Sequence, residues 1–171
     1  MLQSAASQNP VLALAPLPEE RVLDMSAAPG GKTSYISQLM QNSGSIIAND
    51  LKPQRQKATV ANMHRMGCKN VIVCCYDGRK IPSVMKGFDR VLLDAPCSGE
   101  RGVVQKKSEL AEWKEKRSKN FGIRQYSLLA SAFSSLKPGG RIVYSTCSIS
   151  PYENDQVIAK LKMVYDDELI G

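Results

Sequence analysis

The sequence is poor in the residues that build metal centres and disulfide frameworks. Its 171 residues include a single histidine, His64, and five cysteines, none of them in a CxxC pair. One histidine cannot complete a zinc site of the Cys/His type, and an odd number of cysteines without paired spacing is typical of a reducing, intracellular compartment. We therefore expect no bound metal, and we expect the cysteine thiols to be free for chemistry.

Long apolar runs are also missing. No stretch approaches the ~20 apolar residues that cross a bilayer, and the N-terminus lacks the basic segment of a signal peptide. We expect a soluble protein that makes no membrane contact. With 43% hydrophobic and 23% charged residues, the composition is that of a globular domain, and a chain of this length buries roughly two-thirds of its surface without needing disulfides. We expect one domain over residues 1–171, acting as a monomer.

The formal net charge of +7 favours a polyanionic partner, because each Lys or Arg near a phosphate releases condensed counterions. Nucleic acid is the partner that this charge predicts, and a basic protein without such a partner is the alternative. The densest charge lies in residues 106–119, where six basic and three acidic side chains surround Trp113. Because the signs are mixed, a solvated surface helix is favoured over a nucleic-acid contact.

Strand and helix patterns alternate along the chain. Strands are expected over residues 21–25, 45–49, 71–75, 88–94 and 141–145. Helices are expected over residues 2–14 (broken at Pro10), 33–41, 52–66 (with Ala58 and Ala61 facing inward), 121–136 and 152–162. This alternation predicts an α/β fold, in which a mostly parallel open sheet has helices on both faces. Such sheets bind ligands at the carboxyl ends of their strands.

A loop of small residues follows the first expected strand and runs into a helix. It consists of Ser26, Ala27, Ala28, Pro29, Gly30, Gly31 and Lys32. Such a turn lets the backbone approach a ligand closely, and the N-terminus of the next helix offers N–H groups to a carboxylate. The loop has neither the GxGxxG spacing of dinucleotide-binding folds nor the GxxxxGK[ST] spacing of nucleoside triphosphate loops, so both ligands are disfavoured.

Aspartates stand at the ends of the next strands. Asp50 lies about 20 residues past the glycines, where an acidic side chain accepts hydrogen bonds from ribose hydroxyls. Asp77, after the third strand, is placed to accept a bond from an adenine amino group. Each aspartate taken alone is more safely interpreted as a turn residue or helix cap. Their recurrence at successive strand ends favours an adenosine-bearing ligand.

Two later strands each lead to a cysteine. The motifs are Asp94-Ala95-Pro96-Cys97-Ser98-Gly99 and Ser145-Thr146-Cys147-Ser148. Together with residues 27–33, they resemble the Nop2/Sun (Fmu, RsmB–RsmF) family of RNA cytosine-5 methyltransferases, and the resemblance covers nearly the whole chain. It implies the class I Rossmann-like methyltransferase fold, S-adenosylmethionine as cofactor, and RNA as substrate, with ribosomal RNA favoured and transfer RNA as the alternative.

The resemblance also implies roles for the matching residues. Ser26 to Lys32 would cradle the methionine part of S-adenosylmethionine, Asp50 would hold its ribose, and Asp77 would meet its adenine ring. Asp94 would lie between the methyl donor and the target base. There it would also hydrogen-bond the N3/N4 edge of cytosine and stabilise the charge that moves to this edge.

The cysteines would carry the covalent chemistry. Cys147 would attack C6 of cytosine, which makes C5 nucleophilic enough to accept a methyl group, and Cys97 would assist breakdown of the adduct. A thiol with the usual pKa of about 8.5 is little ionised at neutral pH, so positive charge from the sulfonium or from Lys32 should lower the pKa of Cys147. The remaining cysteines are expected to be small buried apolar side chains: Cys68, Cys74 and Cys75.

The sequence also departs from the family pattern. Residues Glu100-Arg101-Gly102 follow the PCSG motif where the Nop2 branch has TG, a difference that is similar to the mitochondrial-type branch. A Nop2-like protein would be nucleolar or nuclear, and another member cytoplasmic or mitochondrial. The chain starts near the family motif that residues 3–14 resemble and stops before the family's final strands. We therefore expect a catalytic domain without the upstream RNA-binding region.

Two other functions compete with this interpretation. A DNA cytosine-5 methyltransferase would use Cys97 as its nucleophile, but the Thr-Cys-Ser motif at Cys147 argues against it. A protein that binds the cofactor without turnover, as a scaffold in ribosome assembly, is the second alternative. The presence of both cysteines together with Asp94 and Lys32 argues against inherited inactivity.

Overall fold

The computed structural model describes residues 5–99 and 115–166, and the chain divides into two compact units. Unit 1 comprises Met1–Asp94 and Ser131–Tyr144, and unit 2 comprises Ala95–Ala130 and Ser145–Gly171. The departure at residues 100–102 lies outside the described residues, as does most of the charge-dense segment with Trp113.

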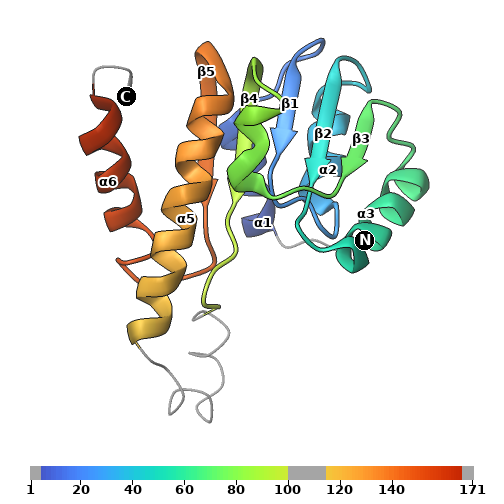
Figure 1. The fold of residues 1–171 in the computed structure, drawn as a ribbon. Helices are drawn as coiled ribbons and strands as arrows, with labels where there is room; N and C mark the ends of the chain where they lie inside the picture. The colour runs from blue at the N-terminus through green and yellow to red at the C-terminus, as the bar shows by residue number, and fades with distance from the viewer. Residues whose placement is uncertain (1–4, 100–114, 167–171) are drawn as a thin grey trace. The chain divides into compact units, whose positions relative to one another are not determined.

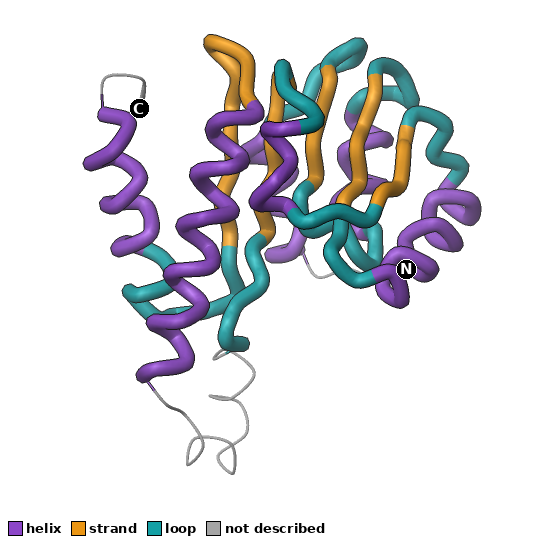
Figure 2. The backbone as a smooth tube through the Cα atoms, viewed as in Figure 1, coloured by secondary structure: helices purple, strands orange, loops and turns teal. Residues whose placement is uncertain are grey.

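Unit 1 is built on a five-stranded sheet with the strand order β3-β2-β1-β4-β5 (Figures 1 and 2). The strands are β1 (Arg21–Asp24), β2 (Ser45–Asn49), β3 (Val71–Cys74), β4 (Phe88–Asp94) and β5 (Leu136–Ser145). β1 pairs in parallel with β2 on one side and with β4 on the other, and β2 pairs in parallel with β3. The strand order therefore reverses at β1, and open α/β sheets bind ligands at the carboxyl ends of the strands beside such a reversal.

Helices cover both faces of this sheet. α1 (Ala5–Leu14), α2 (Gly31–Leu39) and α3 (Pro53–Met66) lie on one face (Figure 1). The 3₁₀ helix η1 (Gly78–Ser83) and the C-terminal end of α5 (Glu115–Ser135) lie on the other, where the Ser131 hydroxyl donates to the Gly78 carbonyl at 2.6 Å. A sheet covered in this way requires strands that are apolar on both sides.

The core of unit 1 lies between the sheet and α1 and α2. Apolar side chains of β1, β2 and β4 pack there against the two helices, and all members of this cluster are fully buried: Val11, Leu14, Val22, Ile36, Met40, Ile46 and Leu92. In β4 the adjacent residues Val91, Leu92 and Leu93 are each buried. This continuous apolar run is what made β4 recognisable as a central strand, and its bounds are those predicted.

Unit 2 contains the larger part of α5, helix α6 (Asp155–Tyr165) and the loops that carry Cys97 and Cys147. In the middle of α5, a side chain at Gly122 would collide with the carbonyl of Tyr152. A glycine inside a helix costs about 1 kcal/mol relative to alanine. Its presence here allows the loop before α6 to approach the helix backbone closely.

Two helix predictions need correction. α1 continues from Ala5 to Leu14 through Pro10 instead of breaking there, because burial of Val11 and Leu14 in the core outweighs one lost backbone hydrogen bond. In α3, Ala58 and Ala61 are exposed, whereas Gln56, Thr59 and Met63 face inward. The Gln56 amide donates to the carbonyls of Ala48 and Cys74 at 3.1 and 2.5 Å, so a polar residue occupies the inward face.

The chain between the last helices also differs from the prediction. α5 begins at Glu115, six residues before the expected start, and β5 begins at Leu136 rather than after the Lys-Pro-Gly-Gly turn. That turn is present inside the bounds of β5, where Gly139 has φ +75°. η1 was not predicted at all, because its short polar sequence lacks a helical apolar period.

Among the described residues, no helix combines the length and the apolar character needed to cross a membrane.

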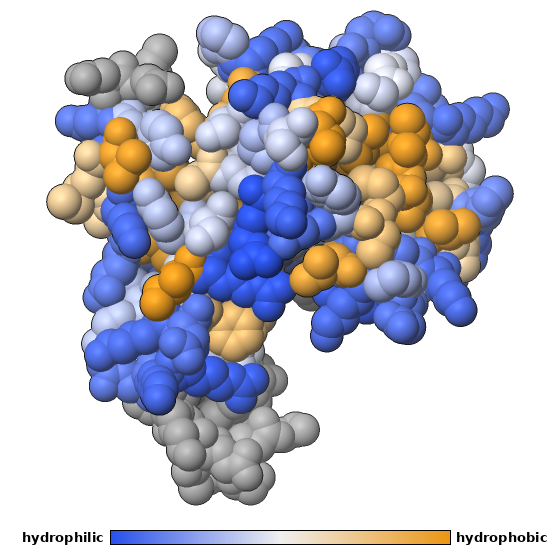
Figure 3. Space-filling model, in the orientation of Figure 1, coloured by the Kyte–Doolittle hydropathy of each residue, from blue (hydrophilic) through white to orange (hydrophobic). Residues whose placement is uncertain are grey.

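Exposed apolar side chains gather over the edge strand β3 and the neighbouring α3, where Figure 3 shows an orange area. On these two elements, Val60 of α3 and Ile72 of β3 have 42% and 59% of their surface exposed.

Candidate functional site

The loop between β1 and α2 turns at Gly30. This residue caps α2 with φ +96°, a left-handed conformation that favours glycine. A Cβ at this position would lie 2.9 Å from Met63 Cε and 3.2 Å from Thr59 Cγ2. Two constraints therefore require glycine at position 30. The turn needs a positive φ, and helix α3 packs directly against the Cα of this residue.

Side chains of helix α3 hold this loop through the loop's carbonyl oxygens. Arg55 Nη2 donates to the carbonyl of Ala28 at 2.8 Å, and Asn62 Nδ2 donates to the carbonyl of Pro29 at 2.7 Å. The first N–H groups of α2 have no acceptor within their own helix. N–H groups of this kind are the donors that bind carboxylates at helix N-termini.

The loop lines a cavity of about 160 Å³ in unit 1. Its walls are Ser7, Ser26, Ala27, Ala28, Pro29, Gly31, Lys32 and Asp94. Drug-sized ligands occupy pockets of about 300–1,000 Å³, so this cavity has room for one end of such a ligand. Ser7, on α1, was not among the predicted site residues, because the expected break at Pro10 gave no reason to place α1 at the loop.

Lys32 and Asp94 form an ion pair inside this cavity. The Lys32 Nζ lies 2.6 Å from Asp94 Oδ2, and both side chains are half-buried. The structure thus brings the loop together with the predicted aspartate at the end of β4. A charge-assisted bond of this length fixes the direction of the carboxylate.

Sequence reasoning missed a buried aspartate, Asp24, at the end of β1. One of its oxygens accepts a 2.7 Å bond from the Thr33 hydroxyl, and its side chain is 1% exposed. Burial raises the pKa of Asp24 from its ordinary value of 3.8 to about 6. The signal was available in the sequence, since Asp24 ends the strand that precedes the loop as Asp94 ends β4.

Asp50, predicted to hold a ribose, is 3% exposed at the end of β2. Its Oδ1 accepts from the Lys52 backbone N–H at 3.0 Å, so it also acts as a turn residue before α3. Its Oδ2 lies 3.1 Å from Arg55 Nη1. Arg55 therefore connects Asp50 to the glycine loop through the carbonyl of Ala28.

Asp77, predicted to meet an adenine ring, caps η1. Its Oδ1 accepts from the backbone N–H of Arg79 at 3.0 Å, and the Arg79 guanidinium pairs with the carboxylate at 2.6 Å. The hydrogen bond from Arg79 lowers the pKa of Asp77 to about 2. The interpretation of Asp77 as a helix cap thus holds, and any ligand contact would be made by a carboxylate that Arg79 already orients.

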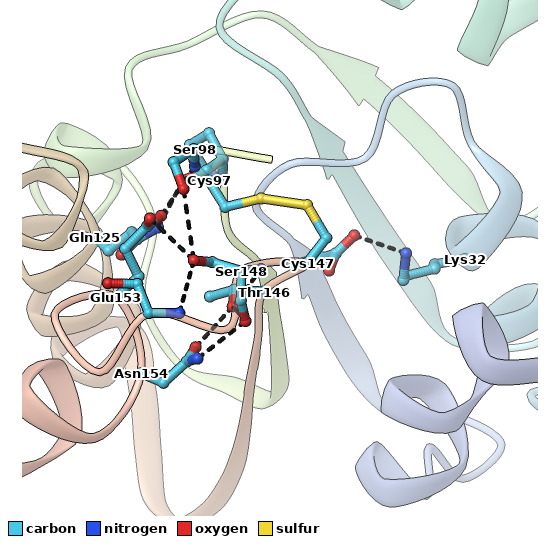
Figure 4. The surroundings of a disulfide bond; sticks show 12 residues. Lys32, Cys97, Ser98, Gln125, Thr146, Cys147, Ser148, Glu153 and Asn154 are labelled. Atoms are coloured by element: carbon cyan, nitrogen blue, oxygen red, sulfur yellow. Dashed lines mark hydrogen bonds and ion pairs between the residues drawn. A yellow bond between two sulfur atoms is a disulfide. The ribbon is translucent and has the colours of Figure 1, made fainter. Parts of the chain in front are cut away.

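In unit 2 the two motif cysteines lie together. Their Cα atoms are 6.3 Å apart and their sulfurs are joined as a disulfide (Figure 4), so the expectation of free thiols is wrong at these positions. The loops meet because the Ala95 N–H donates to the carbonyl of Ser145 at 2.8 Å, just before each cysteine. Cys147 is exposed and Cys97 is half-buried.

The other three cysteines are free, as expected, but they are not buried. Cys68 and Cys74 are half-buried and Cys75 is exposed, so the prediction that they serve as core residues is wrong. β3 lies at the edge of the sheet, which leaves its last residues partly open to solvent. The partial burial of Cys74 still raises the pKa of its thiol.

A buried polar cluster supports both cysteine loops. It is formed by side chains that sequence reasoning did not select, namely Ser98, Gln125, Ser148 and Glu153. Ser98 and Ser148 follow the two cysteines directly in the sequence. Glu153 is 0% exposed, and its position among polar residues before the last helix carried no pattern that would have indicated burial.

Comparison with known proteins places these features in a family context. The sequence matches the family described as 16S rRNA methyltransferase RsmB/F over residues 11–169. It is 53% identical, over 92% of the chain, to a mouse 28S rRNA (cytosine-C(5))-methyltransferase, and 44% identical, over 97%, to the ribosomal RNA small subunit methyltransferase F of Escherichia coli K12. The chain spans about 20% of the mouse protein and 35% of the bacterial one.

A similar solved structure is that of NSun6 from Pyrococcus horikoshii with the S-adenosylmethionine analogue SFG. The TM-score is 0.87 at 36% identity, and the match covers 95% of this chain and 41% of the other. The predicted fold class, a class I Rossmann-like methyltransferase with an open parallel sheet, is thereby confirmed.

Proposed function

This chain belongs to the family of 16S rRNA methyltransferases RsmB/F, and we propose that it is the catalytic domain of an RNA methyltransferase that modifies C5 of a cytosine in ribosomal RNA. The observation that carries the proposal is the cysteine pair. Cys97 and Cys147 come from different strand ends, yet their Cα atoms lie 6.3 Å apart and Cys147 is exposed. Two adjacent thiols suit a reaction in which one attacks the base and the other assists release.

The residues of unit 1 fit S-adenosylmethionine, which supplies the methyl group. The cavity at the glycine loop suits the methionine end of the cofactor, because its carboxylate would meet the N-terminus of α2 and Lys32 stands beside it. The buried carboxylate of Asp50 suits the ribose hydroxyls. Asp77 suits the adenine amino group, with Arg79 fixing its orientation.

Cys147 is the proposed nucleophile, and it acts in the reduced form of the protein. Its Sγ bonds to C6 of cytosine, and the electron pair moves toward N3. C5 would then take the methyl group from the cofactor's sulfonium, whose S–CH₃ bond breaks to leave S-adenosylhomocysteine. Removal of the C5 proton then breaks the Sγ–C6 bond and restores the aromatic ring, a step that Cys97 assists. An external thiol must first reduce the disulfide by exchange, because a disulfide sulfur cannot act as the attacking thiolate.

Asp94 is proposed to contact the N3/N4 edge of the cytosine. Lys32 holds its carboxylate in one direction at 2.6 Å. A carboxylate held in this way accepts a hydrogen bond from the N4 amino group and orients the ring without reorganising, whereas a hydrogen bond to N3, where the electron pair moves, requires the protonated acid as donor. Loss of Lys32 should therefore impair turnover even if cofactor still binds.

The proposal is tested by incubating the full-length protein, under reducing conditions, with ribosomal RNA and methyl-labelled S-adenosylmethionine. Digestion to nucleosides and mass spectrometry should find the label as 5-methylcytidine, and Cys147→Ala should abolish it. Label in DNA or in protein would contradict the proposal. Cofactor binding without transfer to RNA by the reduced protein would favour the scaffold function instead.

A further inference from the structure

The carboxylate of Glu153 lies at the centre of the polar cluster in unit 2. Its Oε2 accepts from the Ser98 backbone N–H and from Gln125 Nε2, both at 2.9 Å, and its Oε1 accepts from the Ser148 hydroxyl at 3.0 Å (Figure 4). The side chain is 0% exposed. One buried acid thus accepts hydrogen bonds from the residue after each cysteine and from helix α5.

These bonds tie the two cysteine loops to each other as well as to Glu153. The hydroxyls of Ser98 and Ser148 lie 3.5 Å apart, and Ser148 Oγ also accepts from the Ser150 N–H at 3.1 Å. Gln125 Nε2 donates a second bond, of 2.8 Å, to the carbonyl of Pro96, just before Cys97. The backbone on both sides of Cys97 is therefore held by Gln125 and Glu153.

The loop that carries Glu153 is itself fixed at both ends. Asn154 Nδ2 donates to the Ser148 carbonyl at 3.0 Å, and Asn154 Oδ1 accepts from the Thr146 hydroxyl at 2.7 Å. Gly122 of α5 leaves room for the Tyr152 carbonyl beside it. The carboxylate is thus delivered to the cysteine loops by a segment with little freedom to shift.

Burying an ionised carboxylate is costly unless hydrogen bonds compensate for lost water, and apolar side chains of similar volume often stabilise a fold at least as well. The burial of Glu153 is therefore better explained by the groups that its carboxylate holds in place than by a gain in the free energy of unfolding. These groups are the residues that follow the two cysteines.

We propose that Glu153 is a positioning residue for the cysteine chemistry: its carboxylate fixes the Cys97 loop against the Cys147 loop so that both sulfurs reach one pyrimidine ring. This rests on the proposed function of the two cysteines. Glu153 itself, buried beneath the loops, does not contact the substrate.

The direct test is Glu153→Gln in the full-length protein, with Asp155→Asn as the control. Glutamine keeps the size of the side chain but turns one acceptor oxygen into an NH₂ donor, which then faces a donor from Ser98, Gln125 or Ser148. Asp155 is exposed at the start of α6, so its substitution removes one charge from the same segment without touching the cluster. Glu153→Gln should lower kcat about 100-fold, as displacement of a reacting group does, while the KM for S-adenosylmethionine stays at the wild-type value.

A second readout does not depend on RNA methylation. In a glutathione redox buffer, one oxidised glutathione and the two protein thiols give the Cys97–Cys147 disulfide and two reduced glutathiones. Alkylation and mass spectrometry measure this equilibrium, which reports the effective concentration of one thiol at the other. Glu153→Gln should lower the equilibrium constant for disulfide formation about tenfold or more, and Asp155→Asn should leave this constant unchanged.

Wild-type kcat together with a wild-type disulfide equilibrium in Glu153→Gln would overturn the proposal. If circular dichroism shows that Glu153→Gln does not fold, the same equilibrium is measured for Ser148→Ala, which removes one hydrogen bond to Glu153. Ser127→Ala on α5 is its control. Identical disulfide equilibria for Ser148→Ala and Ser127→Ala would also overturn the proposal. If the wild-type protein methylates no RNA, the proposed function fails, and the disulfide equilibrium still tests whether Glu153 positions the loops.

Discussion

Arg55 joins Asp50 to the carbonyl of Ala28: its Nη1 lies 3.1 Å from Asp50 Oδ2, and its Nη2 donates to the Ala28 oxygen at 2.8 Å. One guanidinium thereby links the proposed ribose acceptor to the proposed methionine loop. The fork of N–H donors in arginine allows this double contact, which a lysine cannot reproduce.

We predict that Arg55→Ala weakens binding of S-adenosylmethionine about tenfold, the equivalent of one hydrogen bond to a charged group. Isothermal titration calorimetry checks this, with Lys57→Ala as the control, because Lys57 is an exposed cation on the same helix. Equal affinities of the two variants would show that Arg55 does not organise the site.

Gly30→Ala and Gly67→Ala form a matched pair. Both glycines have a positive φ, +96° and +66°, so alanine costs about 1–2 kcal/mol of backbone energy at either. At Gly67 no atom lies within 4 Å of the added Cβ, whereas at Gly30 the Cβ meets Met63 Cε at 2.9 Å. Urea unfolding should therefore show a larger loss for Gly30→Ala, and calorimetry should show weakened cofactor binding in that variant alone. Equal losses would mean that the contact with α3 relaxes freely.

The raised pKa of Asp24 predicts how the free energy of unfolding depends on pH. Its pKa is about 6 in the folded protein against an ordinary 3.8, so the folded state holds this proton more tightly than the unfolded chain does. As the pH rises through these two values, the unfolded chain loses the proton first, and the fold becomes less stable by about 3 kcal/mol in total. The loss is complete once the folded protein has also released the proton, about one pH unit above its pKa of about 6.

Replacing Asp24 with Asn removes this titration while preserving an acceptor for Thr33. The difference in unfolding free energy between Asp24→Asn and wild type should therefore shift in favour of the variant by about 3 kcal/mol between about pH 3 and about pH 7. Denaturant titrations at several pH values measure it. Two parallel curves would contradict the raised pKa.

Much of the fold could be predicted because local patterns and tertiary requirements agree. β2 and β4 are apolar runs bounded by polar turns, and their predicted bounds match those observed. Disagreement arose where packing outweighs local preference. Pro10 lies inside α1 because its neighbours are buried, and Gln56 faces inward because two strand carbonyls need a donor.

The candidate site was predictable to the extent that strand ends reveal it. The glycine loop and Asp94 line one cavity, as their positions after β1 and at the end of β4 suggested. The partners of these residues were not predictable, since Arg55, Asn62 and Glu153 act through distances that no sequence spacing encodes. The close approach of Cys97 and Cys147, 50 residues apart, likewise depends on tertiary structure, because their loops follow β4 and β5, which are neighbours in the sheet.

The division of labour between the two cysteines is tested most directly by trapping the covalent adduct. Full-length Cys97→Ala and Cys147→Ala should each be incubated with ribosomal RNA and S-adenosylmethionine under reducing conditions and resolved on a denaturing gel. We predict that Cys97→Ala remains bonded to RNA, because Cys147 still attacks C6 but release is blocked, and that Cys147→Ala forms no adduct. A trapped adduct with Cys147→Ala instead would contradict the account and assign the nucleophile to Cys97.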